Sequence, residues 1–225
     1  MTKIIYWAAF GEEPTPDLEL KPLMGYMAST QKEHIGENYL ACPAIRGKHI
    51  NTFYGIFPHD LEVSFENGIK SNHPKLINER VGLYHDSFAF DCIFNRIFFS
   101  PTSQIMETSP AFLHQTSYSK YGHAPSGGFD IGQWFRPSAP AFQLWPGVKE
   151  FKASKGEAHL YFNFPNEDKI QLQQFEMTDT LYSIASANVL HKSNVPRQSL
   201  ISIYNRFTRS GFSKKIMSEI EANLL

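Results

Sequence analysis

The chain has 225 residues, and its 21 Lys and Arg residues nearly balance its 22 Asp and Glu residues, which gives a formal net charge of −1. So small a charge offers no electrostatic basis for nucleic acid or an anionic membrane as the main partner. Aromatic residues make up 14% of the chain and include 19 Phe, a composition that excludes a disordered protein and predicts a packed core.

Apolar side chains recur mostly at every second residue up to about residue 177, a spacing typical of strands. We expect strands over residues 1–10, 51–57, 61–65, 87–94, 96–99, 129–135, 142–145, 148–153, 158–164 and 169–175. Turn signals such as Asn67-Gly68 and Pro146-Gly147 separate these segments. Many short strands with turns between them favour an antiparallel β-sandwich or jelly roll.

The apolar spacing changes to three and four residues after residue 177, which predicts helices over 178–190, 196–208 and 213–224. Thr178 or Asp179 and Ser213 suit N-cap positions, Pro196 suits a first helical turn, and Gly211 suits a break. The expected fold is therefore α+β and mainly β. A sandwich or jelly-roll-like core (1–177) and helices packed on it (178–225) form a single domain, 1–225. The alternative is that these helices cover another chain.

The densest group of chemistry-bearing residues lies between 114 and 159, and within it we select Tyr118, Trp134, Arg136 and Trp145 as candidate binding residues. Aromatic rings of this kind stack on sugars or bases, and a neighbouring Arg binds anions. A Phe-rich sandwich also uses such rings as ordinary core, which is the competing interpretation. A carbohydrate-binding module that uses Trp134 and Trp145 is a further alternative.

Glu157 and His159 are two residues apart, which places both side chains on one face of a strand. A carboxylate and an imidazole so placed suit two ligands of iron or zinc, with His114 or His123 as the third. The order Glu-Ala-His, however, reverses the His-x-Asp or His-x-Glu pattern of cupin-like oxygenases. We therefore expect no cofactor, and keep an iron or zinc site as the alternative.

No motif of nucleophilic or phosphate-binding catalysis is present: the sequence has neither a Gly-x-Ser-x-Gly elbow nor a Walker loop. Asp91 lies mid-strand among Phe residues, and we expect it to pair with a cation such as Arg96. Cys42 and Cys92 are too few for a disulfide scaffold, and we expect two buried thiols in a reducing compartment. No apolar run approaches the roughly 20 residues of a spanning helix. The expected location is therefore cytoplasmic.

Residues 121–137, which read YGHAPSGGFDIGQWFRP, and 155–162, KGEAHLYF, resemble uncharacterised proteins of tailed bacteriophages, notably marine ones. The resemblance implies a phage-encoded protein that acts in the host cytoplasm or in the virion. It carries no known activity, so it assigns no role to any residue.

The leading hypothesis is a non-catalytic β-sandwich protein, a phage structural, assembly or binding protein that acts through an aromatic surface. A protein partner or a homo-oligomer is expected, a small molecule or glycan remains open, and neither nucleic acid nor a membrane is expected. The alternative is a cupin-like mononuclear non-haem iron oxygenase of the 2-oxoglutarate type, or a related metal enzyme.

Overall fold

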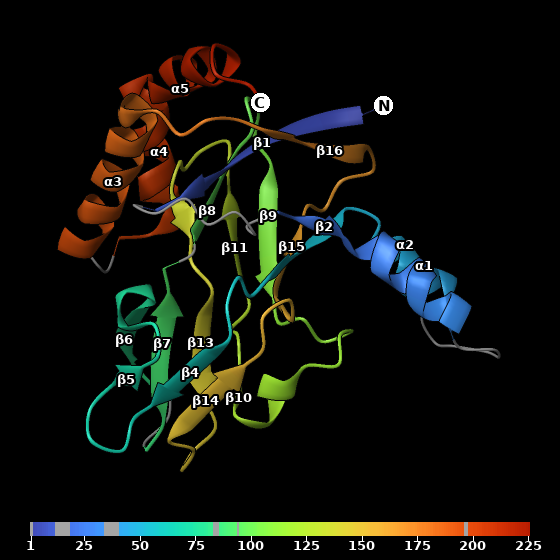
Figure 1. Ribbon diagram of the computed structural model, residues 1–225. Helices are drawn as coiled ribbons and strands as arrows, with labels where there is room; N and C mark the ends of the chain where they lie inside the picture. The colour runs from blue at the N-terminus through green and yellow to red at the C-terminus, as the bar shows by residue number, and fades with distance from the viewer. Residues whose placement is uncertain (1, 12–18, 34–40, 83–85, 94, 196–197) are drawn as a thin grey trace.

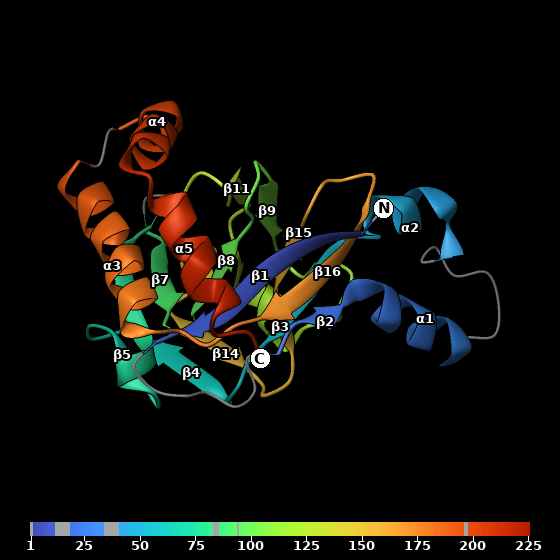
Figure 2. The ribbon, with the colours of Figure 1, turned by 90° about the horizontal axis from the view of Figure 1, so that it is seen from above.

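The computed structural model describes residues 2–11, 19–33, 41–82, 86–93, 95–195 and 198–225. Strands form the body of the molecule, and helices lie at two opposite sides of it (Figures 1 and 2). The N-terminal side carries α1 (Leu23–Glu33) and α2 (Pro43–Lys48). The C-terminal side carries α3 (Asp179–Asn194), α4 (Leu200–Ser210) and α5 (Phe212–Glu221).

The described strands form four sheets. The first holds, in order, β12 (Pro137–Ser138), β8 (Asn95–Phe99), β1 (Thr2–Phe10) and β16 (Lys169–Gln174). The second holds β10 (Gly122–His123), β13 (Ala141–Leu144), β7 (Phe88–Cys92) and β6 (Ile77–Val81). The third holds β11 (Gly127–Asp130), β9 (Ile105–Ser109), β15 (Ala158–Asn163), β3 (Thr52–Ile56) and β2 (Lys21–Pro22). The fourth holds β14 (Glu150–Ala153), β4 (Leu61–Ser64) and β5 (Lys70–Ser71).

Strand pairing within these sheets is antiparallel, except that β1 and β16 run parallel, with Thr2 opposite Lys169. The prediction of a mainly β, α+β fold with sandwich-like packing is therefore confirmed, with one parallel pair added. That pair joins two segments from opposite ends of the chain, so no local turn signal indicates it.

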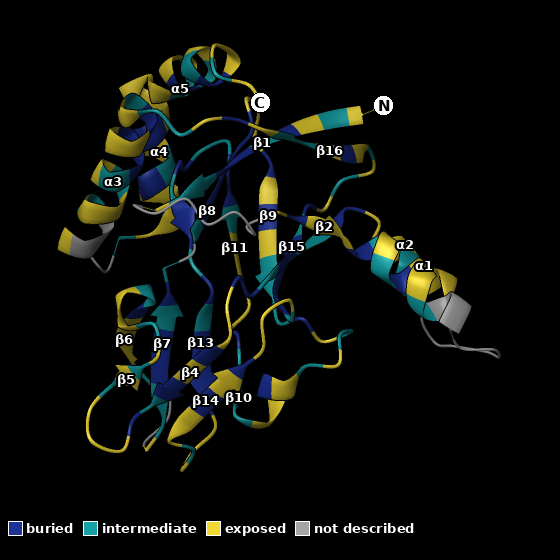
Figure 3. Ribbon diagram, viewed as in Figure 1, coloured by how far each residue is buried: buried dark blue, intermediate teal, exposed yellow. Residues whose placement is uncertain are grey.

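The first sheet is buried on both faces, because its two faces belong to different cores. Ile5 and Trp7 of β1 and Phe98 of β8 point into the large core between the sheets. Ala8, one residue after Trp7, and Ile97, one residue before Phe98, point into a second core under the C-terminal helices. Because successive residues point into different cores, the residues of β8 from 96 to 99 are all buried (Figure 3).

The C-terminal helices cover this sheet as expected. A capping side chain and a glycine mark where these helices begin and end. Thr178 caps α3 by accepting the N–H of Leu181 at 3.3 Å. Gly211 separates α4 from α5 in the left-handed conformation, with φ 70°. One prediction fails, because Ser213 lies inside α5 and does not cap it. The helix α4 begins at Leu200 with Ser199 as its cap, and the helical turn predicted at Pro196 lies outside the described residues.

Two other expectations are incomplete or wrong. We expected only strands before residue 177, but α1 and α2 lie there. The segment 96–99 forms most of β8, which belongs to a different sheet from β7. Cys92 is buried but Cys42 is exposed, and both are free thiols. None of the helices in the described ranges is long and apolar enough to cross a bilayer.

Candidate binding groove

A groove of about 460 Å³ opens where the edge of β11, the segment after it and the start of α4 meet. This volume falls in the range of about 300–1,000 Å³ that is usual for ligand sites. Residues that line it include Gly127, Gly128, Phe129, Trp134, Arg136, Ser138, Gln198, Leu200 and Ile203. Two of the four candidate binding residues, Trp134 and Arg136, are therefore brought together here.

The turn that positions Trp134 and Arg136 is built on the buried carboxylate of Asp130. This carboxylate accepts hydrogen bonds from Gln104 N–H at 2.9 Å, Gly132 N–H at 2.8 Å and Gln133 Nε2 at 2.7 Å. Burial raises the pKa of Asp130, but these bonds and one from Ser103 outweigh burial, so the pKa is lowered overall. The chain therefore ends β11 at Asp130 and turns, and the strand predicted over 129–135 is wrong beyond that residue.

Arg136 is held over two aromatic rings, 4.7 Å from the Trp134 centroid and 5.4 Å from that of Phe129. Such cation–π contacts fix the direction of a guanidinium. Its Nε donates to the carbonyl of Pro137 at 3.0 Å, and no described carboxylate forms an ion pair with it. Burial lowers the pKa of Arg136, and the charge of Asp91 offsets this in part. Arg136 lines the groove, and the hydrogen bond of its Nε is the one that its guanidinium makes with the described residues.

The helix α4 closes the other side of the groove, and its cap explains why it begins there. Ser199 accepts the N–H of Ser202 at 3.3 Å, and Ile203 and Phe207 form the buried stripe. The hydroxyl of Tyr204 accepts the N–H of Asp130 at 2.8 Å, which fastens the helix to the end of β11. Leu200 and Ile201 lie outside that stripe and are 43% and 72% exposed.

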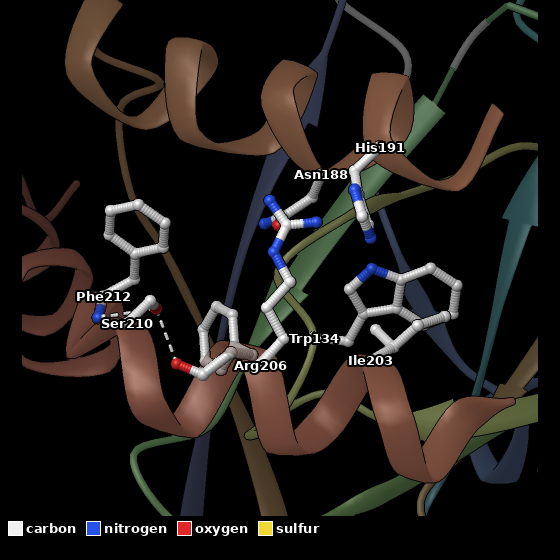
Figure 4. A pocket seen from close by; sticks show the side chains of 8 residues that line it. Trp134, Asn188, His191, Ile203, Arg206, Ser210 and Phe212 are labelled. Carbon is white, nitrogen blue, oxygen red and sulfur yellow. Dashed lines mark hydrogen bonds between the residues drawn. The ribbon is translucent and has the colours of Figure 1, made fainter. Parts of the chain in front are cut away.

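A second, smaller cavity of about 20 Å³ lies behind Trp134 and Ile203, which both cavities share. Asn188 and His191 of α3 and Arg206 of α4 line it (Figure 4). Asn188 donates to the carbonyl of Phe135 at 2.9 Å, so it anchors the same turn to α3. The space suits about one water molecule and not an organic ligand.

The other two candidate binding residues lie away from the groove. Tyr118 is 4% exposed and donates to the carbonyl of Ala158 at 2.8 Å, so it is core, and burial raises its pKa. Trp145 is 40% exposed, but its ring stacks on His123 at 4.6 Å and its N–H donates to Ser119. The two tryptophans of the glycan alternative therefore do not line one groove.

The four candidate metal ligands have separate partners. Glu157 accepts from Ser117 N–H at 2.8 Å and Ser154 N–H at 3.0 Å, and so joins two loops. His114 Nδ1 lies 2.7 Å from the Tyr161 hydroxyl, and burial lowers its pKa to about 4. Among the described residues no group of three or more His, Cys, Asp or Glu could hold a metal ion.

His159 lies in the core beside Arg96, with Nε2 3.3 Å from Nη1, and both residues are fully buried. Burial and the neighbouring Arg96 lower the pKa of His159, and burial lowers that of Arg96 to about 9. The predicted Asp91–Arg96 pair is wrong, because Asp91 instead pairs with Arg80 across β6 and β7 at 2.5 Å.

Sequence reasoning missed the part of the groove that comes from Gln198 and from Leu200 and Ile203 of α4. The Ser199 cap and the Ile203–Phe207 spacing are the signals that indicate this helix, but nothing local indicates that it meets β11. Fold and site together define a mainly β protein with a mixed aromatic and cationic groove. No family model, curated protein or solved structure matches the chain.

Proposed function

We propose that this is a non-catalytic binding protein that holds a partner protein by a carboxylate seated on Arg136 in the groove. The observation that carries the proposal is the guanidinium itself, stacked on Trp134 and Phe129 and without an ion pair among the described residues. A guanidinium fixed in this way is arranged for bidentate contact with a planar anion.

Two further features support a binding role over a catalytic one. The described residues that line the groove include the hydroxyls of Thr108, Ser126 and Ser138, but no His, Asp, Glu, Lys or Cys that could act beside them as a base or a metal ligand. The segment 178–225, which supplies one wall, carries six Lys and Arg against three Asp and Glu, although the whole chain has a net charge of −1. The lining residues include none of these six, but the net positive charge of the segment favours the approach of an acidic partner.

The resemblance of residues 121–137 to tailed-phage proteins supports a phage setting, since this segment contains both β11 and Arg136. In that setting the protein acts as a structural or assembly protein, and the groove is the contact through which it joins another component. The phage setting is a separate proposal, and the groove does not depend on it.

The test is a selection of yeast-displayed random hexapeptides on the purified full chain. We expect enrichment of Asp or Glu on the wild type, loss of that enrichment on Arg136→Gln, and its retention on Arg209→Gln. Arg209 is a matched control, because it lies on the exposed face of α4 and does not line the groove. Equal acidic enrichment on Arg136→Gln, or no acidic enrichment on the wild type, would overturn the proposal.

A further inference from the structure

We infer that the partner enters the groove as an extended peptide, which pairs with the free edge of β11 at Gly128 while its carboxylate contacts Arg136. This inference rests on the proposed function and goes further, because it assigns the backbone of the groove a part in binding. The juxtaposition of a free strand edge and a fixed guanidinium carries it.

The direction of the β11 backbone follows from its hydrogen bonds. In an antiparallel pair the N–H and C=O groups of successive residues point alternately toward and away from the partner strand. The N–H of Ile131 donates to Gln104 at 2.9 Å, on the β9 side, whereas the N–H of Asp130 donates to Tyr204, on the opposite side. Gly128, two residues before Asp130, therefore directs its N–H and C=O away from β9.

The strand is open along this side. β11 is the edge of its sheet, and β9 is its only strand partner in the described part of the chain. Gly127 and Gly128 are both exposed and line the groove, and neither carries a side chain that would screen the backbone. An exposed edge of this kind is the usual acceptor for a strand added by another chain.

Charge complementarity defines the chemistry of the occupant. The described residues that line the groove include the cation Arg136 and no carboxylate. A peptide that pairs at Gly128 lies alongside Phe129 and Arg136, so an Asp or Glu of that peptide reaches the guanidinium. A small anion such as acetate or phosphate contacts Arg136 alone and leaves the Gly128 edge unpaired. A comparison of the peptide with these anions therefore tests the strand pairing separately from the contact with Arg136.

The first measurement uses an acidic hexapeptide enriched in the selection above, synthesised with N-methyl groups at even or at odd positions. N-methylation removes backbone donors from one edge of an extended peptide at a time. We expect one methylated form to bind about tenfold more weakly and the other to bind within about twofold of the parent. Equal affinities of all three forms, with Arg136 still required, would overturn the strand pairing and leave the proposed function intact.

The second measurement is amide hydrogen exchange of the full chain with and without the peptide. We expect the Gly128 amide to gain about tenfold protection when the peptide binds, while the Gly127 amide, which faces β9, changes little. Sodium acetate and sodium phosphate serve as separate arms, and neither should protect Gly128. An unprotected Gly128 amide in the saturated peptide complex, or equal protection by acetate or phosphate, would contradict the inference.

Discussion

The N–H of Asp130 donates to the Tyr204 hydroxyl across 2.8 Å, and this hydrogen bond fastens α4 to the last residue of β11. The carboxylate of Asp130 also accepts the hydrogen bonds that hold the turn carrying Trp134 and Arg136. One residue thus sets both walls of the groove, through its carboxylate on one side and its backbone on the other.

The Tyr204→Phe variant tests this connection. It leaves the Asp130 N–H without its acceptor in a partly buried position, which costs about 1–3 kcal/mol of unfolding free energy. Urea denaturation measures this loss. Tyr182→Phe is the matched control, because the Tyr182 ring stacks on Phe10 at 4.8 Å and the substitution keeps that ring, so its effect stays within about 0.5 kcal/mol. Equal losses in the two variants would mean that the hydroxyl of Tyr204 does not hold α4.

The positions of Trp134 and Arg136 show which part of the site can be predicted from the local sequence. Their proximity to each other follows from two-residue spacing, and the sequence therefore indicates an aromatic and cationic pair. The turn that presents them depends on contacts of Asp130 with Ser103 and Gln104, which lie 27 and 26 positions earlier in the chain. No local pattern contains that information, so the segment was expected to continue as a strand.

Asp91 and Arg96 show the opposite error, since proximity in the sequence suggested a pair that does not form. The chain changes sheets between β7 and β8, and the two side chains separate. Arg80, on the neighbouring strand β6, forms the ion pair with the Asp91 carboxylate instead. The Thr178 cap was predictable, because Thr178 contacts an amide only three residues away.

The second prediction concerns the pH dependence of stability. Nδ1 of His114 lies 2.7 Å from the Tyr161 hydroxyl, and the ring stacks on Tyr26 at 3.7 Å. Burial lowers the pKa of His114 to about 4, whereas an unfolded His titrates near about 6.5. The unfolded chain therefore binds more protons between these values. Stability is fully present above about pH 6.5, falls as the pH is lowered toward 4, and levels off below that.

His114→Phe removes the titrating imidazole, whose pKa burial lowers in the wild type, so the stability loss between pH 6.5 and 4 should become shallower in the variant. Proton NMR titration of the wild-type imidazole measures the pKa, and melting temperatures of both proteins at several pH values measure the stability loss. His159, whose pKa burial also lowers, adds a loss of the same sign, so the comparison with wild type isolates His114. A wild-type His114 that titrates near 6.5 would contradict the assignment.

The third prediction uses two glycines that respond to Ala with opposite signs. A Cβ on Gly55 of β3 would lie 2.7 Å from Cε1 and Nε2 of His159 and 2.8 Å from Nη1 of Arg96. Both neighbours are fully buried and have no solvent to move into, so Gly55→Ala overpacks the core and destabilises the fold by about 1–3 kcal/mol.

Gly25 lies inside α1, where nothing lies within 4 Å of an added Cβ. Gly25→Ala therefore stabilises the protein by about 0.5–1 kcal/mol, through the smaller backbone entropy of Ala in the unfolded chain. Urea midpoints measured with unchanged slopes distinguish the two signs. A stable, unchanged Gly55→Ala protein would show that the Arg96–His159 pair has room to move, and that the close approach of β3 to this buried pair does not constrain residue 55.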